Sequence, residues 1–376
     1  MSSQLQGKHI VVIGAGVIGL QTAITLLEAG AAVTIIAKHV PGDKAKDYTS
    51  PWAGAQWRTH ATAEDKEIQQ WDIESYNIWL DMVEKEKSQA SFATKSGLEK
   101  FHSIFYWTAP DTEIASGPRS AWWAPYMRNF RELPASELPP GVHAGATYDA
   151  VTIDTGVYLP FLLTRARSLG ATLIEAALPI TNGLSGALST ARSLLPAYGV
   201  STPVDAFVNA SGILAKDLVP DPDVHPIRGQ TVLVRGLPQA LTTCWRPDGL
   251  SYVIPRATSG TTVLGGTKQV GDWRELPDVE TTRDILERCR GFAPELLDAE
   301  GRFEVLSVNV GFRPGRVGGP RVEVEEVRVD GGAPVPCCHE YGHAGAGYQN
   351  SFGSAKKVVG LLEGYFEKKK SGKAKL

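Results

Sequence analysis

The chain has 376 residues, of which 43% are hydrophobic and 21% are charged, and its net charge at pH 7 is −3. This length and composition are typical of a globular protein with room for two domains, and the near balance of charge excludes the basic footprint of a nucleic-acid-binding protein. No apolar run is long enough to predict a membrane span, the N-terminus has no apolar signal region, and the four cysteines form no C-x-x-C pair that would predict a zinc site.

The first predicted element is an apolar strand that runs into a glycine-rich turn, VVIGAGVIGL, at residues 11–20. Gly14 allows the tight turn, Gly16 lets a pyrophosphate approach the backbone, and Gly19 lets the following helix pack close to the sheet. The first helical turn, with Val17 and Ile18, presents free N–H groups to the phosphates. Residues 9–40 therefore predict a dinucleotide-binding β-α-β unit, with a glycine-rich turn that binds nothing as the alternative.

The second strand lacks the acidic residue that usually binds a ribose hydroxyl at this point. Lys38 and His39 stand where that residue is expected, and Asp43 lies too far along the chain. We expect either that Lys38 meets a phosphate of the cofactor or that the cofactor is held mainly by its other contacts.

The remaining elements predict two domains that interleave. Residues 62–84 and 157–169 are predicted helices, 171–175 and 206–209 are predicted strands of the first sheet, and 354–368 is a predicted closing helix. Alternating segments separated by Pro and Gly, from 229 to 329, predict a mainly antiparallel sheet. We assign residues 1–58, 145–225 and 335–370 to one domain, and 59–144 and 226–334 to the other.

A series of motifs follows the predicted elements from the first strand to the last helix. They are TSPWAGAQW (49–57), NASG (209–212), PIRGQTVLV (226–234), SYVIPR (251–256), GGTKQVGDW (265–273), VGFRPGRVGGPRVE (310–323) and YGHAGAGYQNSFG (341–353). In this order they resemble the flavin-dependent family of D-amino-acid oxidases and D-aspartate oxidases.

The resemblance implies an α/β fold in which a Rossmann-like FAD-binding domain is interleaved with a mainly antiparallel-sheet substrate domain. It also implies bound FAD and the oxidation of D-amino acids by dioxygen to 2-oxo acids, ammonia and hydrogen peroxide. A nicotinamide-dependent dehydrogenase and a flavin-binding protein without catalysis are the alternatives from other classes.

Arg313 is the strongest candidate for a substrate contact, because a guanidinium fork on an apolar strand matches a carboxylate with two hydrogen bonds. The alternative is a structural salt bridge. Tyr252 resembles the family tyrosine whose hydroxyl binds the same carboxylate. Gln349 and the carbonyl of Gly345 fall where the family positions the substrate amine and a water molecule.

The motif and the resemblance also assign a set of residues to FAD. Main-chain N–H groups of the loop around residues 53–55 would stabilise negative charge on the reduced flavin. The assigned residues are Gly14, Gly16, Val17, Ile18, Gly19, Lys38, Thr49, Ser50, Ala53, Gly54, Ala55, Gln56, Ser211, Gly212, Gly347, Tyr348 and Gln349.

Lys268 indicates a lean toward acidic substrates, D-aspartate and D-glutamate. It stands where the resemblance places a basic residue in D-aspartate oxidases and an uncharged one in relatives that act on neutral substrates, and a second cation would recognise a second carboxylate. Arg58 and Arg246 are further candidates for this role. A lysine exposed at the end of a strand, with a preference for neutral D-amino acids, is the alternative.

Residues 371–376 are predicted to be a disordered basic tail that ends in Ala374, Lys375 and Leu376. This tripeptide is close to the S-K-L peroxisomal signal, so we expect peroxisomal localisation and an import receptor as a partner; a solvated lysine-rich tail is the alternative. The other expected partners are the D-amino acid, dioxygen and a second copy of the chain in a homodimer. Neither nucleic acid nor a membrane is expected.

Overall fold

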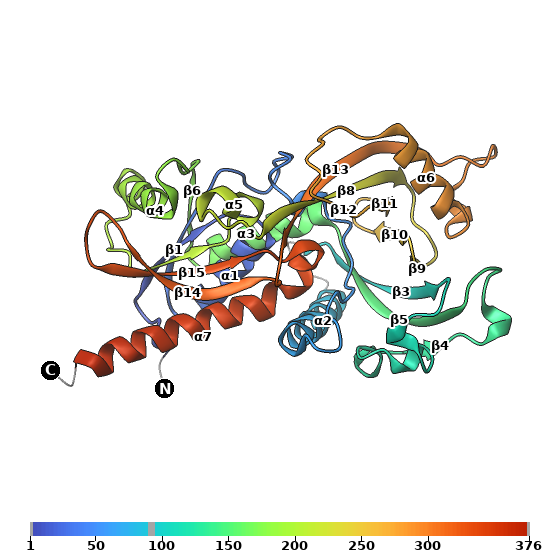
Figure 1. Cartoon of the computed structure of the whole chain (residues 1–376), viewed down its shortest axis with the longest axis horizontal. Helices are drawn as coiled ribbons and strands as arrows, with labels where there is room; N and C mark the ends of the chain where they lie inside the picture. Colours follow the sequence, from blue (N-terminus) through green and yellow to red (C-terminus); the bar gives the residue numbers. More distant parts are fainter. Residues whose placement is uncertain (1–2, 89–94, 374–376) are drawn as a thin grey trace. The chain divides into compact units, whose positions relative to one another are not determined.

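The computed structural model describes residues 3–88 and 95–373. The chain forms two compact units, each assembled from segments that lie far apart in the sequence (Figure 1). Unit 1 contains Met1–Pro51, Leu159–Pro226 and Arg313–Leu376, and unit 2 contains Trp52–Tyr158 and Ile227–Phe312. The limits between the units, after residues 51, 158, 226 and 312, differ from the predicted limits after residues 58, 144, 225 and 334.

Unit 1 is built on a six-stranded sheet in the order β14-β15-β7-β1-β2-β6. All neighbouring strands are parallel except β14 and β15. The four central strands are buried along nearly their whole length, as expected for parallel strands covered on both faces. The strands are β1 (His9–Ile13), β2 (Ala32–Ala37), β6 (Thr172–Glu175), β7 (Ala206–Asn209), β14 (Arg321–Arg328) and β15 (Pro334–Tyr341).

Helices cover both faces of this sheet. α1 (Val17–Glu28) packs against α7 (Gly347–Lys373), which also contacts β14 and β15. α4 (Gly183–Leu194) and α5 (Ala215–Leu218) pack on a cluster that includes Val11 and Ile13 of β1. Because side chains alternate along a strand, α4 lies on the face of β1 opposite to that occupied by Ile10 and Val12. Most of α3 (Thr155–Ser168) also belongs to unit 1.

Unit 2 contains most of a nine-stranded sheet in the order β12-β8-β11-β10-β9-β3-β5-β4, with β13 also paired to β8. The pairs along this order are antiparallel except for β3 with β9. The strands are β3 (Leu98–Trp107), β4 (Arg131–Glu132), β5 (Ala144–Ile153), β8 (Val224–Arg235), β9 (Leu241–Arg246), β10 (Gly249–Arg256), β11 (Thr261–Gly265), β12 (Gln269–Val270) and β13 (Val305–Arg316).

Two helices accompany this sheet, α2 (Lys66–Ser88) and α6 (Val279–Arg290). α6 begins at a clear N-cap, because the side chain of Asp278 accepts a hydrogen bond from the N–H of Thr281 (2.7 Å). Ile285 and Cys289 of α6 pack on a cluster of residues from β8, β10 and β11. One face of these strands is therefore closed by the helix.

Several element limits differ from those predicted. The helix predicted at 62–84 begins only at Lys66, and it is preceded by a turn in which the carboxylate of Asp65 accepts from the backbone N–H and from the hydroxyl of Thr62 (2.9 Å each). The helix predicted at 157–169 is α3, which begins two residues earlier and ends one residue earlier. The strand predicted at 171–175 begins at 172, and the strand at 206–209 has the predicted limits.

The largest differences concern β14 and α7. β14 was predicted in the antiparallel sheet of the second domain, but it pairs with β15 at the edge of the first sheet. Its alternation of charged and apolar residues is that of an edge strand with one solvated face. The closing helix predicted at 354–368 extends from 347 to 373, so residues 371–373, predicted as disordered, are helical, while 374–376 lie outside the described residues. The strong helix formers Glu and Lys occupy residues 367–370, directly before these last three residues, Ser371, Gly372 and Lys373.

Within the described residues, no helix is both long enough and apolar enough to cross a membrane.

A carboxyl group lies buried between α1, β15 and α7. Glu340 is 1% exposed, and its Oε2 accepts a hydrogen bond from the hydroxyl of Thr22 on α1 (2.6 Å). Its Oε1 has no hydrogen-bond partner in the described part of the chain. Burial raises the pKa of Glu340 to about 8, against smaller lowering by hydrogen bonds to Thr22 and Ser354. The folded protein therefore holds a proton on this group at neutral pH.

We predict that Glu340→Gln stabilises the protein increasingly as the pH rises from about 4.5 to 8. In the wild type the unfolded chain loses the proton in this range while the folded chain keeps it, so the folded state becomes relatively less stable. Thermal unfolding at pH 5 and at pH 8 should show the variant gaining about 3 °C or more over the wild type at the higher pH. Glu367→Gln, at an exposed position of α7, is the control. Equal shifts at both pH values would contradict the assignment.

Candidate functional site

The glycine-rich turn joins β1 to α1 through contacts between backbones. Gly14 has φ +111°, and a Cβ there would overlap the carbonyl of Ala210, which follows β7. A Cβ at Gly19 would overlap the carbonyl of Gly14. Side chains are therefore excluded at both positions, and the N-terminus of α1 lies where the adjacent parallel strands end. This is the place where α/β sheets bind dinucleotide phosphates.

Neighbouring side chains fix this turn. The N–H of Val17 donates to the hydroxyl of Ser50 (3.0 Å), and the hydroxyl of Tyr348 donates to the carbonyl of Ser50 (2.9 Å). The hydroxyl of Tyr48 donates to the carbonyl of Ala15 (2.7 Å). Sequence reasoning included Ser50 and Tyr348 but missed Tyr48, whose only signal was its place directly before the TSPWAGAQW motif.

A second turn lies beside the first, at the end of β7. The side chain of Asn209 accepts from the N–H of Ser211 (3.2 Å), and Gly212 has φ +60°. The hydroxyl oxygen of Ser211 is buried and has no hydrogen-bond partner among the described residues. A buried hydroxyl without a protein partner, beside a turn whose positive φ favours glycine, fits a polar cofactor such as FAD. The phosphates and hydroxyls of FAD would supply the missing partners.

Two helices begin in this region of unit 1. The α-carbon of Gly347, the first residue of α7, lies close to Val17, the first residue of α1, so that a Cβ on the glycine would come 3.9 Å from a Val17 methyl group. The partial positive charges of both helix N-termini therefore favour an anion here. The predicted residues Gly345 and Gln349 lie at this start of α7, and the side chain of Gln349 is buried.

Lys38 has a protein partner in this structure. Its ammonium pairs with Asp47 (2.6 Å), and the imidazole of His39 lies 2.9 Å from the other oxygen of the same carboxylate. Lys38 thus stands where an acidic residue usually binds the ribose. The carboxylate that balances its charge belongs to Asp47, nine residues later in the sequence.

In unit 2, Arg256 holds the loop assigned to the flavin. Its Nε donates to the carbonyl of Gly54 (2.7 Å), and one terminal nitrogen donates to the carbonyl of Ala53 (2.6 Å). The N–H of Ala55, one of the donors expected for the flavin, is 3.4 Å from the carbonyl of Ile153. Sequence reasoning missed Arg256, although it ends the quoted SYVIPR motif.

The side chain of Gln56, another residue assigned to FAD, donates to the hydroxyl of Thr243 on β9 (3.0 Å). Thr49, the first residue of the same motif, precedes Ser50 in unit 1.

The structure brings Tyr252 and the segment that contains Lys268 together in unit 2. The ring of Tyr252 lies so close to Gly265 and Gly266 that a Cβ at either glycine would overlap it. Lys268 follows two residues later and is exposed, and its ammonium has no ion-pair partner among the described residues.

The other two basic candidates are placed differently. Arg246 shares a face of β9 with Cys244, whereas Tyr252 pairs with Thr243, so Arg246 and Tyr252 leave opposite faces of the sheet. Arg58 contacts the imidazole of His60 (3.1 Å).

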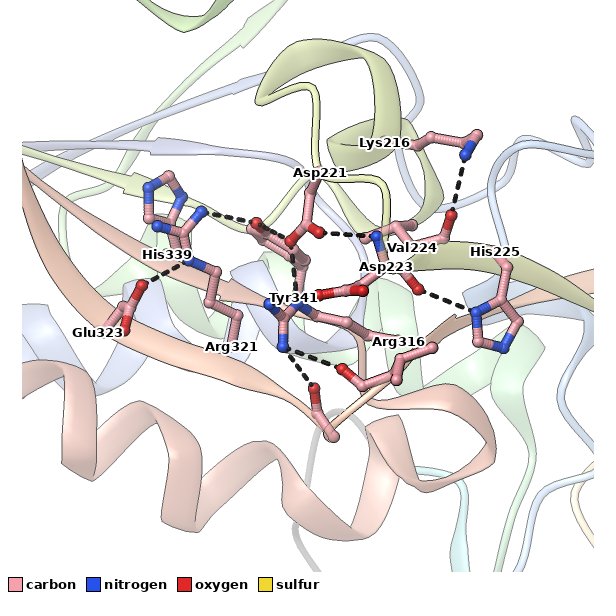
Figure 2. A network of polar contacts seen from close by, with 12 residues as sticks. Lys216, Asp221, Asp223, Val224, His225, Arg316, Arg321, Glu323, His339 and Tyr341 are labelled. Carbon is pink, nitrogen blue, oxygen red and sulfur yellow. Dashed lines mark hydrogen bonds and ion pairs between the residues drawn. The ribbon is translucent and has the colours of Figure 1, made fainter.

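Arg313 lies on β13, three residues before a polar network that anchors the end of this strand (Figure 2). The Nε of Arg316 donates to Asp221 (2.9 Å), and the hydroxyl of Tyr341 donates to the same carboxylate oxygen (2.8 Å). Burial raises the pKa of Asp221, but these hydrogen bonds together lower it by a larger amount. The pKa therefore lies below its ordinary value, and the carboxyl group is ionised at neutral pH. The strand end that carries the half-buried Arg313 is thereby fixed within unit 1.

Both histidines close to the start of α7 are buried. Burial lowers the pKa of His343 to about 4, and its Nδ1 lies 3.3 Å from the side-chain oxygen of Asn350. His339 contacts Asn209 (3.2 Å) and Glu325 (3.0 Å), and burial lowers its pKa as well. Both are therefore neutral near pH 7 and hydrogen-bonded within the protein.

Comparison with known proteins identifies relatives over nearly the whole chain. The model of the DAO family, "FAD dependent oxidoreductase", matches residues 9–361. The chain is 34% identical to a D-amino-acid oxidase from Fusarium vanettenii, covering 94% of this chain and 96% of the relative. It is 31% identical to a D-aspartate oxidase from Talaromyces thermophilus, covering 94% and 95% of the two chains.

Among solved structures, glycine oxidase from Bacillus cereus shares the fold, with a TM-score of 0.70 and 20% identity over 95% of each chain. An FAD-bound L-α-glycerophosphate oxidase from Mycoplasma pneumoniae matches with a TM-score of 0.68 and 16% identity, over 95% of each chain. The predicted fold class, family and FAD cofactor are confirmed. The glycine turn, the motif series and the unpartnered hydroxyl of Ser211 agree with these matches. The chain belongs to the DAO family of FAD-dependent oxidoreductases.

Proposed function

We propose that this protein oxidises D-amino acids with FAD and dioxygen, and that it prefers the acidic substrates D-aspartate and D-glutamate. The reaction yields a 2-oxo acid, ammonia and hydrogen peroxide. D-amino-acid oxidases and a D-aspartate oxidase among the relatives support the general reaction. The acidic preference rests on one observation: Lys268 is a cation without an ion-pair partner in the described chain, two and three residues after the glycines that pack on Tyr252.

The proposed roles are those that the family resemblance implies, and the chemistry of each group suits its role. Arg313 binds the α-carboxylate through two charge-assisted hydrogen bonds, and the hydroxyl of Tyr252 adds a third. The side chain of Gln349 and the carbonyl of Gly345 position the amine. When bound, FAD would supply the hydride acceptor and the redox chemistry that links the substrate to dioxygen. No protein acid or base is required once the amine is neutral, which agrees with the neutral, hydrogen-bonded state of His339 and His343.

Binding through these groups would also allow the enantiomers to be distinguished. With the carboxylate and the amine both held, the two enantiomers exchange the positions of the α-hydrogen and the side chain, and the family resemblance implies that the D-enantiomer would direct its α-hydrogen toward FAD. A preference for neutral D-amino acids is the second candidate, and the exposure of Lys268 favours it. The match to an FAD-dependent family model disfavours a nicotinamide-dependent dehydrogenase.

We predict that Arg313→Ala abolishes useful turnover and leaves the flavin absorption spectrum intact. Loss of the fork should cost about 3 to 5 kcal/mol, or about two to four orders of magnitude in kcat/KM. Peroxide release measured over a range of D-amino-acid concentrations checks this, with Arg328→Ala, on exposed β14, as the control. Near-normal turnover at low substrate concentration would assign Arg313 a structural role instead.

We predict that Lys268→Met raises KM for D-aspartate and D-glutamate about tenfold, because one partly exposed ion pair contributes about 1 to 2 kcal/mol, and leaves KM for D-alanine unchanged. Lys85→Met, at an exposed position of α2, is the matched control. Steady-state peroxide assays on these substrates provide the measurement. If the wild type prefers D-alanine or D-phenylalanine, or if the substitution affects every substrate alike, the neutral preference replaces the proposal.

We also propose that the C-terminal Ala374, Lys375 and Leu376 direct the protein to peroxisomes through an import receptor, which suits an enzyme that releases hydrogen peroxide. A fluorescent fusion that preserves the C-terminus should be punctate, and deletion of Leu376 should make it diffuse. The same distribution for both proteins would exclude this signal. The expected homodimer stays a prediction that light scattering can test.

A further inference from the structure

A buried arginine of unit 2 has no carboxylate in hydrogen-bonding contact. Arg228 on β8 is 1% exposed, and within the described chain its guanidinium donates only to neutral oxygens. Nε donates to the carbonyl of Arg274 (2.7 Å), and one terminal nitrogen donates to the side chain of Gln269 (2.6 Å). The other terminal nitrogen donates to the carbonyl of Leu276 (2.7 Å) and to the side chain of Gln230 (3.0 Å). Burial of a charge is costly, and these four hydrogen bonds offset part of that cost, as does the electrostatic attraction of the Asp272 and Asp278 carboxylates. The concentration of partners in one segment indicates a defined task.

Three of these four acceptors lie in one segment, residues 269–276, and Gln230 extends the same attachment. The side chain of Gln230 accepts from the N–H of Asp278 (2.8 Å) and donates to its carbonyl (2.8 Å). The backbone N–H of Gln230 donates to the hydroxyl of Thr267 (2.8 Å). Since Arg228 and Gln230 share one face of β8, two neighbouring side chains tie residues 269–278 to this strand, and the backbone of Gln230 ties Thr267 to it.

Lys268 lies between two of these attachments. Thr267, before it, is held by the N–H of Gln230, and Gln269, after it, is held both by the guanidinium of Arg228 and by pairing opposite Arg228 in the sheet. Gly266 is held in turn by its N–H bond to the carbonyl of Leu250 (3.3 Å). The backbone on both sides of Lys268 is therefore fixed, while its ammonium is exposed.

We propose that Arg228 is a positioning residue for Lys268, acting through Gln269, and that it thereby sets selectivity for the side-chain carboxylate of acidic D-amino acids. This inference rests on the proposed function of Lys268. A lysine side chain is flexible, so its contribution to selectivity depends on how well its backbone is held before the substrate binds. The planar guanidinium of Arg228 holds this backbone through several hydrogen bonds at once. A lysine at 228 could not reach the same four acceptors.

The test compares selectivity, expressed as kcat/KM for D-aspartate divided by kcat/KM for D-alanine, in the FAD-loaded protein. Arg228→Lys should lower this ratio about fivefold through a higher KM for D-aspartate, with kcat/KM for D-alanine unchanged. Gln269→Met, which removes only one of the four acceptors, should shift the ratio in the same direction. Arg235→Lys, at the exposed end of the same strand, should leave it unchanged. Flavin absorbance and thermal unfolding of each variant verify its folding.

The double variant Arg228→Lys with Lys268→Met separates positioning from a general structural role. If Arg228 acts through Lys268, the double variant should have the same ratio as Lys268→Met alone, and if it does not, the two effects should multiply. Should Arg228→Lys fail to fold, Gln269→Met alone or with Lys268→Met decides the question.

Equal losses for D-aspartate and D-alanine in the Arg228 and Gln269 variants would overturn the inference and leave a structural role. If Lys268→Met alters the ratio while the Arg228 and Gln269 variants keep the wild-type ratio, this inference alone is overturned. A Lys268→Met protein that keeps the wild-type ratio would overturn the proposed acidic preference itself, and this inference with it.

Discussion

The contact between backbones at Gly14 is the constraint on which the first unit depends. A side chain at Gly14 would overlap the carbonyl of Ala210, and one at Gly19 would overlap the carbonyl of Gly14. Only with glycine at both positions can β1 turn directly into α1 beside the end of β7. The same approach places free N–H groups of α1 next to the turn at Ser211, whose buried hydroxyl has no protein partner in the described residues. The absence of side chains at Gly14 and Gly19 therefore allows both the close packing of α1 on the sheet and the binding of an anionic cofactor at the N-terminus of this helix.

Three arginines, of which Arg228 is buried and Arg256 and Arg316 are partly buried, fix the segments around the assigned functional residues. Arg256 takes the carbonyls of the flavin loop, Arg228 takes acceptors on the segment after Lys268, and Arg316 pairs with Asp221 at the strand end after Arg313. The planar fork of arginine reaches several acceptors at once, which a lysine cannot do. In each case a loop or strand end that would otherwise be free to move is tied to a strand or to a buried carboxylate.

Neutral ionisable groups lie around the start and along the length of α7. Glu340 keeps its proton, and His339 and His343 are uncharged, because burial penalises the charged form of each. The N-termini of α1 and α7, which are backbone features, add positive potential in this part of unit 1. A cofactor phosphate would meet dipoles whose strength does not change across the physiological pH range.

The sequence by itself determined the family, the cofactor and the glycine turn, because these depend on local spacing and on the order of short motifs. It also located β7 and the existence of α2, α3 and α7, since hydrophobic periodicity is a local property. Only the tertiary structure decided that β14 joins the first sheet, that Lys38 pairs with Asp47, and that Arg246 leaves the face opposite to Tyr252. It also decided the tasks of Arg228 and Arg256, whose hydrogen-bond acceptors, apart from Gln230, lie 41 to 203 residues away in the chain. Partners at such separations leave no periodic or local signal, so the folded backbone alone determines which of the chain's arginines meets which oxygen.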